Sequence, residues 1–170
     1  MILIFFIKIL KFFRLIHTEL FKKYYRKKFA SGGETAFFYG KNLPIIKGEM
    51  NIHLGRGVKL NEFAYLYARN NAKIYIGDHS TISSFATLIT AGYEINQWVL
   101  EKPGDLKDIH VQRDIIIGKH CWIASKAIIL PGVEIRGTNV VVAAGAIVTR
   151  SYDESNIVLG GAPAKIIKRI

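Results

Sequence analysis

The stretch IGKHCWIASKAIILPGVEI, residues 117–135, decides the fold. It places isoleucine at every sixth position, at Ile117, Ile123, Ile129 and Ile135. A period of six is neither the 3.6-residue period of a helix nor the two-residue alternation of a strand. The stretch therefore predicts a chain that coils through short strands joined by corners, with one aliphatic side chain per strand directed at a common axis.

The same period extends in both directions along the chain. Leucine, isoleucine or valine fills the corresponding positions at Leu54, Leu60, Leu66, Ile76, Ile82, Leu88, Val141 and Ile147. Small or modest side chains recur four residues further on, as at Ser80, Ala86, Cys121 and Ala127. Three hexads would make one triangular coil of about 18 residues, and such coils stack at about 4.8 Å. The pattern predicts a β-solenoid domain over residues 51–170, with capped ends and a short stack that gains from oligomerisation.

The repeat is interrupted twice. Four extra residues lie between Leu66 and Ile76, within ARNNAKIY, and predict a bulged corner. A 23-residue insertion, residues 94–116, separates the hexad that starts at Leu88 from the one that starts at Ile117. Long excursions from a regular repeat are either functional or disordered. Because this one carries Trp98 and other apolar residues, we expect a protruding loop that covers a surface.

The positive charge is concentrated at the N-terminus. The chain has 170 residues and a net charge of +11, of which residues 1–30 supply +7 through eight Lys and Arg against Glu19 alone. The remaining residues are only mildly basic, which argues against a diffuse nucleic-acid surface. Residues 31–50, which open with SGGE, are interpreted as a linker and N-terminal cap. The single Cys121 excludes an internal disulfide and a multi-cysteine zinc site, and fits a cytoplasmic location.

Residues 1–30 predict an amphipathic basic helix. Its longest apolar run is seven residues, far below the roughly 20 needed to span a bilayer. Large apolar side chains followed by the polybasic KKYYRKK are typical of attachment to an anionic membrane surface. We therefore expect peripheral contact with the inner face of the membrane. The alternative is a helix that packs on its own domain or on a neighbouring subunit.

Residues 117–170 resemble the hexapeptide-repeat acyltransferases, and residues 51–93 do so more weakly. The most similar branch holds the maltose, galactoside and xenobiotic acetyltransferases and the O-acetyltransferases of bacterial surface polysaccharides. The resemblance implies an all-β fold, a left-handed parallel β-helix with a C-terminal cap over residues 158–170. It also implies a homotrimer that binds acetyl-CoA, as co-substrate, in the groove between adjacent subunits.

The resemblance assigns one set of cofactor-binding residues to the pantetheine arm of acetyl-CoA. Trp122, Ala124 and Ser125 in WIASKAIILPG match the positions that flank this arm. Ala144 matches a position whose backbone N–H contacts the arm. A small residue is needed there because a bulky side chain would fill the groove.

A second set matches the nucleotide end of the coenzyme. Thr149 and Arg150 match a Thr-Lys pair beside the nucleotide, and Lys165 and Lys168 match basic residues that face its phosphates. Cationic side chains are suited to polyphosphate recognition.

The catalytic residues depart from the family pattern. An ungapped match places Tyr93 where the family carries the histidine that accepts the proton of the acceptor hydroxyl. Histidine, with a pKa near 6.5, is a good general base at neutral pH, and tyrosine, near 10, is a poor one. His110, late in the insertion, is the candidate replacement, with Asp108 or Asp114 to orient its ring.

The other polar candidates carry less information. Asn70 and Asn71 lie near the position where some relatives use a carboxylate to hold the acceptor, so acceptor specificity does not transfer. The remaining histidines are lesser candidates for the base; these are His17, His53, His79 and His120.

The function expected from these residues is acetyl transfer from acetyl-CoA to a saccharide hydroxyl. The basic N-terminus favours a role in surface polysaccharide biosynthesis, such as capsule, lipopolysaccharide or exopolysaccharide. A non-catalytic scaffold and an amino-sugar N-acetyltransferase remain alternatives. A carbonic-anhydrase-like zinc site needs two histidines five residues apart, and no pair in this chain has that spacing, so no metal is expected.

Overall fold

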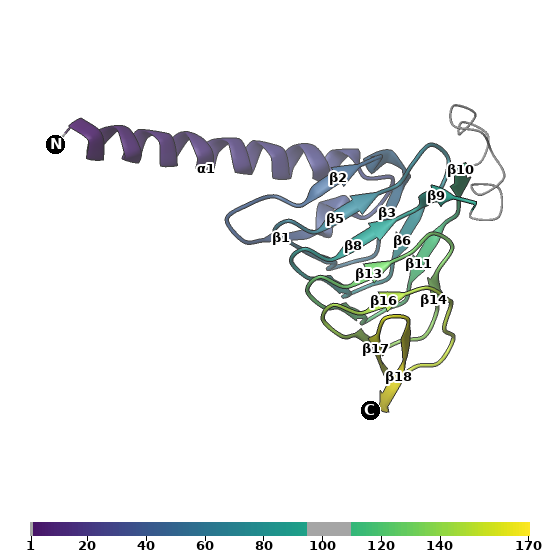
Figure 1. Ribbon diagram of the computed structural model, residues 1–170. Helices are drawn as coiled ribbons and strands as arrows, with labels where there is room; N and C mark the ends of the chain where they lie inside the picture. Colours follow the sequence, from purple (N-terminus) through teal and green to yellow (C-terminus); the bar gives the residue numbers. More distant parts are fainter. Residues whose placement is uncertain (1, 95–109) are drawn as a thin grey trace, which may run out of the picture.

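A computed structural model describes residues 2–94 and 110–170, and Figure 1 shows their arrangement. One long helix, α1 (Ile2–Lys28), precedes a body of short strands. Two single-turn helices, η1 (Gly33–Thr35) and η2 (Glu49–Asn51), lie near the start of that body. α1 lies across one end of the body, and the C-terminus lies at the other end.

Three sheets form the sides of the body. Sheet A contains β3 (Ile52–Leu54), β6 (Ile74–Ile76), β11 (Ile115–Ile117) and β14 (Glu134–Ile135). Sheet B contains β1 (Phe37–Tyr39), β4 (Lys59–Asn61), β7 (Thr81–Ile82), β12 (Trp122–Ile123), β15 (Val140–Val142), β17 (Ile157–Gly161) and β18 (Ala164–Arg169). Sheet C contains β2 (Ile45–Lys47), β5 (Tyr65–Tyr67), β8 (Thr87–Ile89), β13 (Ile128–Ile129) and β16 (Ile147–Val148).

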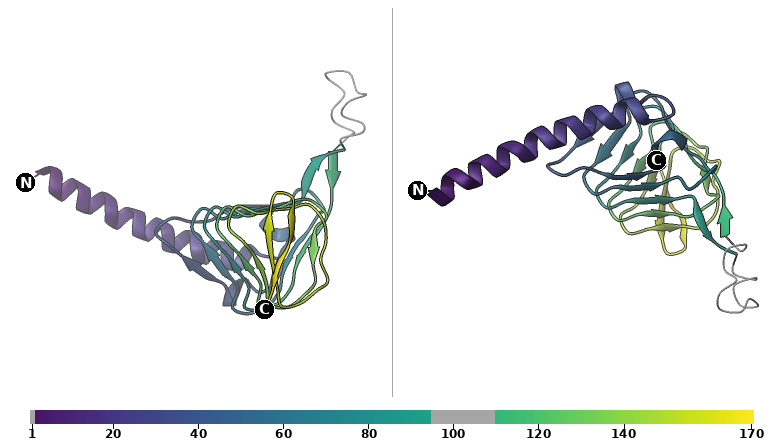
Figure 2. Two further views of the ribbon diagram at one scale, coloured as in Figure 1. Left: turned by 60° about the horizontal axis from the view of Figure 1, so that its bottom comes forward. Right: turned by 90° about the horizontal axis from the view of Figure 1, so that it is seen from above.

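The chain passes through sheets C, A and B in turn, so each circuit adds one parallel strand to every sheet. Equivalent residues stack: Leu60 is in register with Ile82, and Ile82 with Ile123. Viewed from the end in Figure 2 (left), the successive circuits overlie one another with a triangular outline. The described residues therefore form a mostly β structure of parallel sheets with one N-terminal helix.

The aliphatic side chains of the hexads form the core. Leu60, Leu66, Ile82, Leu88, Ile123, Ile129 and Ile135 are completely buried. Full burial of an aliphatic side chain contributes about 1.5–3 kcal/mol. The stack of identical positions is thus the main source of stability for the body.

The predicted period is wrong by one residue in the last full coil. Val142 and Val148 are fully buried, whereas Val141 and Ile147 are only half-buried and face outward. Ile117 is in register with Ile135, and Ile123 with Val142, so the step from sheet A to sheet B takes six positions in one circuit and seven in the next. Val142 therefore takes the place in register with Ile123 that the six-residue period gives to Val141.

Left-handed backbone conformations mark the corners between sheets. At the corners from sheet A to sheet B, one residue per circuit has a positive φ: Gly57, His79, His120, Asn139 and Asn156. Only glycine adopts this conformation without strain, so the other side chains need support from neighbouring circuits. The rings of His79 and His120 provide it by stacking with centroids 5.3 Å apart.

Both predicted interruptions lie at the corner between sheets C and A. Residues 68–73 bulge between β5 and β6. In the next circuit β9 (Ala91–Tyr93) leaves this corner and pairs antiparallel with β10 (His110–Gln112), before the chain enters β11. This hairpin projects from the body in Figure 2.

The C-terminal end is closed by a second hairpin, in which β18 folds back antiparallel to β17. At the N-terminal end, α1 extends well beyond the body. No helix in residues 2–94 or 110–170 has both the length and the apolar character needed to cross a bilayer.

Candidate functional site

The β9–β10 hairpin brings together the two predicted catalytic residues, which are 17 positions apart in the sequence. Tyr93 and His110 are directly opposite in the antiparallel register. Their ring centroids lie 4.3 Å apart, with the ring planes inclined at 35°. The intervening residues 95–109, including Trp98 and Asp108, lie outside the described residues.

Arg69, which sequence reasoning missed, completes this group. Its Nη1 lies 3.1 Å from Nδ1 of His110. Since a guanidinium can only donate, Nδ1 must accept, and the ring proton is on Nε2. The signal that could have revealed Arg69 is its place in the four-residue bulge, directly before Asn70 and Asn71.

Buried Thr90 holds the backbone of Arg69 in place. The Arg69 backbone N–H donates to Oγ1 of Thr90 over 2.9 Å, and that hydroxyl donates to the carbonyl oxygen of Tyr67 over 3.2 Å. Thr90 has no exposed surface. It therefore links the bulge that carries Arg69 to the strand that leads into the hairpin.

The base of the hairpin is also fixed on its other side. Nη2 of Arg113 lies 3.5 Å from Oε2 of Glu94, and the Arg113 backbone N–H donates to the Thr90 carbonyl over 2.9 Å. Asp114 accepts the Lys73 backbone N–H over 2.8 Å. Arg69 is thus the residue seen to contact the His110 ring nitrogen, and Asp114 serves the adjacent backbone.

The residues predicted to flank the pantetheine arm lie at a different corner, between sheets B and C. Trp122 is in β12, half-exposed, and its indole Nε1 donates to Oγ of Ser83 over 2.8 Å. Ser125 and Ala144 are exposed at equivalent corners of successive circuits. Ala124 is buried beside them.

The surface at this corner leaves room for a ligand. Gly145, directly after Ala144, has a φ of +71°, and a Cβ built on it would meet no atom within 4 Å. Its backbone N–H donates to the Ser125 carbonyl over 3.0 Å. Ala144 and Gly145 therefore place no bulky side chain at this corner, whereas the preceding circuit carries the exposed Lys126 next to Ser125.

The predicted nucleotide-end residues surround the C-terminal hairpin. Thr149 and Arg150 are exposed after β16, and Lys165 and Lys168 are exposed on β18. Nε of Arg150 donates to the hydroxyl of Tyr152 over 3.1 Å, and the guanidinium lies 5.3 Å from the centroid of that ring. The hydrogen bond with Tyr152 raises the pKa of Arg150 above its ordinary value. The guanidinium of Arg150 is thus held against the Tyr152 side chain.

A single copy of the chain does not bring all these residues into one place. The Tyr93–His110–Arg69 group and Arg150 lie at the edge shared by sheets C and A. Trp122, Ser125 and Ala144 lie at the edge shared by sheets B and C. The full width of sheet C separates the two groups.

The remaining histidines have structural surroundings. His79 and His120 stack on each other at a corner, and the His53 ring stacks on Tyr75 with centroids 4.7 Å apart. Burial lowers the pKa of His53. The His17 ring lies 4.5 Å from that of Phe21 within α1. Among the described residues, no three His, Cys, Asp or Glu side chains come together as a metal-binding group.

Comparison with known proteins places this geometry among acetyltransferases. The chain is 33% identical over 152 residues to the galactoside O-acetyltransferase of Escherichia coli K12, a match that covers 85% of this chain and 66% of that protein. The chain thus spans slightly less than two thirds of that relative. No family model matches the chain.

Two solved structures share the arrangement. A galactoside acetyltransferase in complex with coenzyme A superposes with a TM-score of 0.65 at 27% identity, covering 86% of this chain and 68% of that one. The polySia-specific acetyltransferase NeuO superposes with a TM-score of 0.56 at 26% identity, covering 69% of this chain and 51% of that one.

Proposed function

The chain belongs to the hexapeptide-repeat acetyltransferases, and on this premise we propose that it transfers an acetyl group from acetyl-CoA to a hydroxyl of a saccharide. The observation that carries this proposal is the group formed by Tyr93, His110 and Arg69 at one edge of the stack. In this group His110 supplies an ionisable ring beside Tyr93, the position at which the family carries its histidine. The coiled sheets are proposed to have the left-handed sense of the β-helices in this family.

The chain offers residues suited to acetyl-CoA. The small residues Ser125, Ala144 and Gly145 would leave room for a narrow pantetheine arm, because a Cβ built on Gly145 meets no atom within 4 Å. The exposed cations Arg150, Lys165 and Lys168 would pair with the phosphates. When bound, acetyl-CoA supplies an acetyl group activated as a thioester.

His110 is proposed to move the proton. Its Nδ1 would accept the proton of the attacking saccharide hydroxyl, and would return a proton to the thiolate that leaves when the C–S bond breaks. In this structure Arg69 donates to the same lone pair. An acceptor oxygen that takes over the Arg69 N–H would free Nδ1, so acceptor binding and base activation would be coupled.

A homotrimer would assemble the two separated halves of the site. One outward row of sheet C runs through five residues in register, Ile45, Tyr65, Thr87, Ile128 and Ile147. These side chains are half-buried or exposed, and mostly apolar. If sheet C of three copies faces a threefold axis, the edge between sheets C and A of one copy meets the edge between sheets B and C of the next copy. His110 of one copy would then face Trp122 and Ala144 of its neighbour.

The acceptor class rests on the relatives. The galactoside O-acetyltransferase and the polySia-specific acetyltransferase are both named for saccharide acceptors. We propose a hydroxyl of a surface polysaccharide or its lipid-linked precursor as the acceptor here. Asn70 and Asn71, exposed beside Arg69, are suited to hydrogen bonding with sugar hydroxyls.

A non-catalytic scaffold is the second candidate, and Tyr93 at the usual position of the base is the observation that favours it. The two candidates differ in turnover. Purified full-length protein is incubated with acetyl-CoA and galactosides or oligosialic acids, and thiol release is followed together with the mass of the product. The His110→Ala variant is expected to lose about 10²–10⁴-fold in rate. Coenzyme binding without turnover on any saccharide would favour the scaffold.

A further inference from the structure

α1 contacts the body from about its middle to its C-terminal end, and its last turns are packed most closely. Phe29, directly after the helix, is buried, and its ring stacks on that of Tyr25 with centroids 6.3 Å apart. The hydroxyl of Tyr24 donates to Oε1 of Glu49 over 3.1 Å. The earlier turns extend beyond the coils in both views of Figure 2.

One side of α1, here called the inner face, carries a row of polar residues turned toward the body, with exposed Leu15 beside them. It comprises Lys11, Arg14, Thr18 and Lys22, whose spacing of three or four residues places them on one side of the helix. Arg14 donates to Oδ1 of Asn42 in the loop between β1 and β2. These residues and that loop, at Gly40 and Lys41, line a common hollow.

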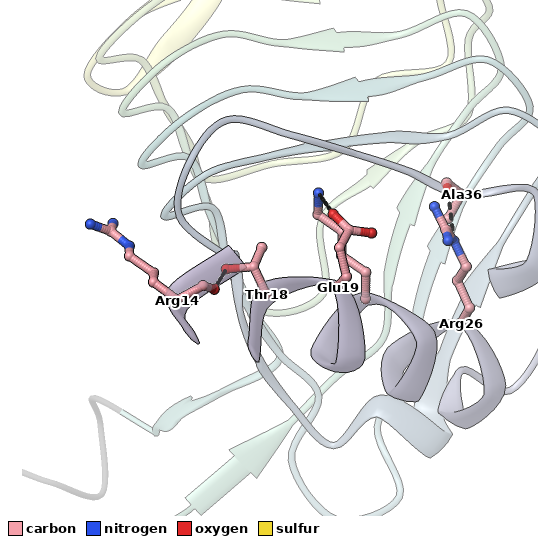
Figure 3. A network of polar contacts seen from close by, with 6 residues as sticks. Arg14, Thr18, Glu19, Arg26 and Ala36 are labelled. Carbon is pink, nitrogen blue, oxygen red and sulfur yellow. Dashed lines mark hydrogen bonds and ion pairs between the residues drawn. The ribbon is translucent and has the colours of Figure 1, made fainter. Parts of the chain in front are cut away.

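The inner face also satisfies its polar groups locally. Thr18, which is buried, donates from Oγ1 to the Arg14 carbonyl over 2.8 Å, and Nε of Arg26 donates to the Ala36 carbonyl over 3.4 Å. Figure 3 shows Thr18 and Arg26 on α1 with these two hydrogen bonds, and Glu19 on the same helix. The polar side of the helix is therefore turned to the protein.

The opposite side, here called the outer face, carries exposed apolar side chains, and Leu20 toward its C-terminal end also borders a hollow with Ile46 and Glu49 of the body. Phe6, Phe13 and Leu20 recur at a spacing of seven, which keeps them on one side, and their exposed fractions are 59%, 63% and 60%. A soluble helix normally shows the reverse arrangement, with its apolar side on the body. Large apolar side chains that stay exposed along a helix in this way indicate an interaction surface.

The charges identify the partner of this surface. Lys27 continues the row of Phe6, Phe13 and Leu20 after another seven residues, and Lys23 lies beside it; both are exposed. The one acidic residue of α1, Glu19, is already paired with Lys22 at 2.8 Å. Parallel packing of outer faces between symmetric copies would bring the Lys27 side chains together. An anionic lipid surface accepts both the apolar row and the lysines.

We propose that the outer face of α1 docks on an anionic lipid bilayer, with the helix lying in the headgroup boundary parallel to the surface. The bilayer would be the negatively charged cytoplasmic leaflet. Because α1 lies across the N-terminal end of the stack in Figure 1, the first coil would be next to the lipid and the C-terminal hairpin distant from it. Exposed Met50, in η2 at the same end, would add to the contact.

The first test is co-sedimentation of the full chain with vesicles of phosphatidylcholine containing about 30% phosphatidylglycerol. The parent protein should bind these vesicles, bind pure phosphatidylcholine more weakly, and lose affinity as salt rises from about 0.1 to 0.5 M. The variant Phe6→Ser/Phe13→Ser/Leu20→Ser should lose at least about tenfold in affinity. Each of Lys23→Gln and Lys27→Gln should lose about fivefold.

A matched control removes exposed apolar surface at the other end of the stack. Ile167 and Ile170, with exposed fractions of 63% and 52%, lie in and after β18. Ile167→Ser/Ile170→Ser should bind vesicles as the parent does. Equal binding by the triple variant, or absence of binding by the parent, would overturn the proposal. If the parent does not bind vesicles and the triple variant differs from it in oligomeric mass, the outer face packs between copies of the chain, and the proposal is also wrong.

The second test reports which face enters the lipid. Phe13→Trp places an indole on the outer face, and Lys11→Trp places one on the inner face. With brominated lipid in the vesicles, the added emission of Phe13→Trp should be quenched and blue-shifted, and that of Lys11→Trp should not. Equal or reversed quenching would contradict the orientation. Vesicle binding needs neither acetyl-CoA nor a saccharide, so failure of these tests leaves the proposed acetyl transfer intact.

Discussion

Nη1 of Arg69 lies 3.1 Å from Nδ1 of His110, so a permanently charged donor occupies a lone pair that a general base needs. The two residues come from different circuits, the first from the bulge after β5 and the second from the hairpin that follows β8. Burial of Thr90 between these segments fixes their separation. The base proposed for this site is thus held in an inactive hydrogen bond while no acceptor is bound.

The first prediction concerns Arg69. Arg69→Met removes the donor, so Nδ1 of His110 stays free to activate water in the absence of a saccharide. We expect slow hydrolysis of acetyl-CoA without acceptor to rise about tenfold, and kcat/KM for the saccharide to fall about 10–100-fold, the value of a hydrogen bond to a charged group. Both rates are measured by thiol release with and without saccharide.

Arg113→Met provides the matched control, because Arg113 also lies at the base of the hairpin and its charged contact is with Glu94. It should leave hydrolysis without acceptor unchanged. If both arginine variants lose transfer equally and neither hydrolyses the thioester faster, Arg69 only supports the hairpin, and the proposed coupling is wrong.

A second prediction concerns Ala144, at the corner proposed to accept the pantetheine arm. Ala144 is exposed, and the neighbouring Gly145 has open space around it. Ala144→Leu should fill this space, weakening coenzyme A binding by at least about tenfold while changing Tm little, since surface substitutions usually alter stability by about 0.5 kcal/mol or less. Calorimetric titration and thermal unfolding check the two effects.

Thr138→Leu also places a leucine at an exposed corner, between sheets A and B and away from the proposed groove. It should bind coenzyme A as the parent does. Unimpaired binding by Ala144→Leu would show that the arm passes elsewhere.

The parts of the fold that follow from a local rule could be predicted from the sequence. The isoleucines at 117, 123, 129 and 135 are buried because each hexad repeats the same local geometry. The coil that contains Val141 and Val142 departs from the prediction, because the spacing of buried residues along the strands does not set the number of residues in a corner. Because residues 141 and 142 are both valine, either could fill the buried position of the strand. The register of the corner places Val142 there.

The candidate site divides in the same way. Tyr93 and His110 could be named from the resemblance and from chemistry, but their contact depends on an antiparallel pairing across the insertion, which has no periodic signal. Arg69 was missed because its place in the first interruption of the repeat does not show which side chain it contacts. Only the stacking of successive circuits places it against the histidine.

The third prediction tests the register of the last coil. Val142→Ala should lower the free energy of unfolding by about 1–3 kcal/mol, as expected for a cavity in a closely packed core. Val141→Ala, half-buried on the outward side of sheet B, should lower it by about 0.5 kcal/mol or less. Chemical denaturation of both variants measures the difference. Equal losses, or a larger loss for Val141→Ala, would support the six-residue period over the observed register.

The fourth prediction concerns the proposed trimer. Ile128 lies in the middle of the outward row of sheet C, between Thr87 and Ile147, and is half-buried in the single chain. A charge placed there would have to be desolvated at a threefold interface, which is strongly unfavourable without a partner. Ile128→Asp should therefore convert the trimer to monomers, as measured by light scattering, with little change in the folded monomer.

Ile116→Asp makes the same substitution on the outward side of sheet A, where Ile116 is also half-buried and lies next to Tyr75 in the register. It should remain trimeric. In the proposed assembly the trimer and the site are linked, since Trp122 and His110 lie at opposite edges of sheet C in one copy. The monomer formed by Ile128→Asp should accordingly lose acetyl transfer even though both residues are intact. A monomeric variant with full activity would show that each chain carries a complete site, and the edge-to-edge assembly would have to be abandoned.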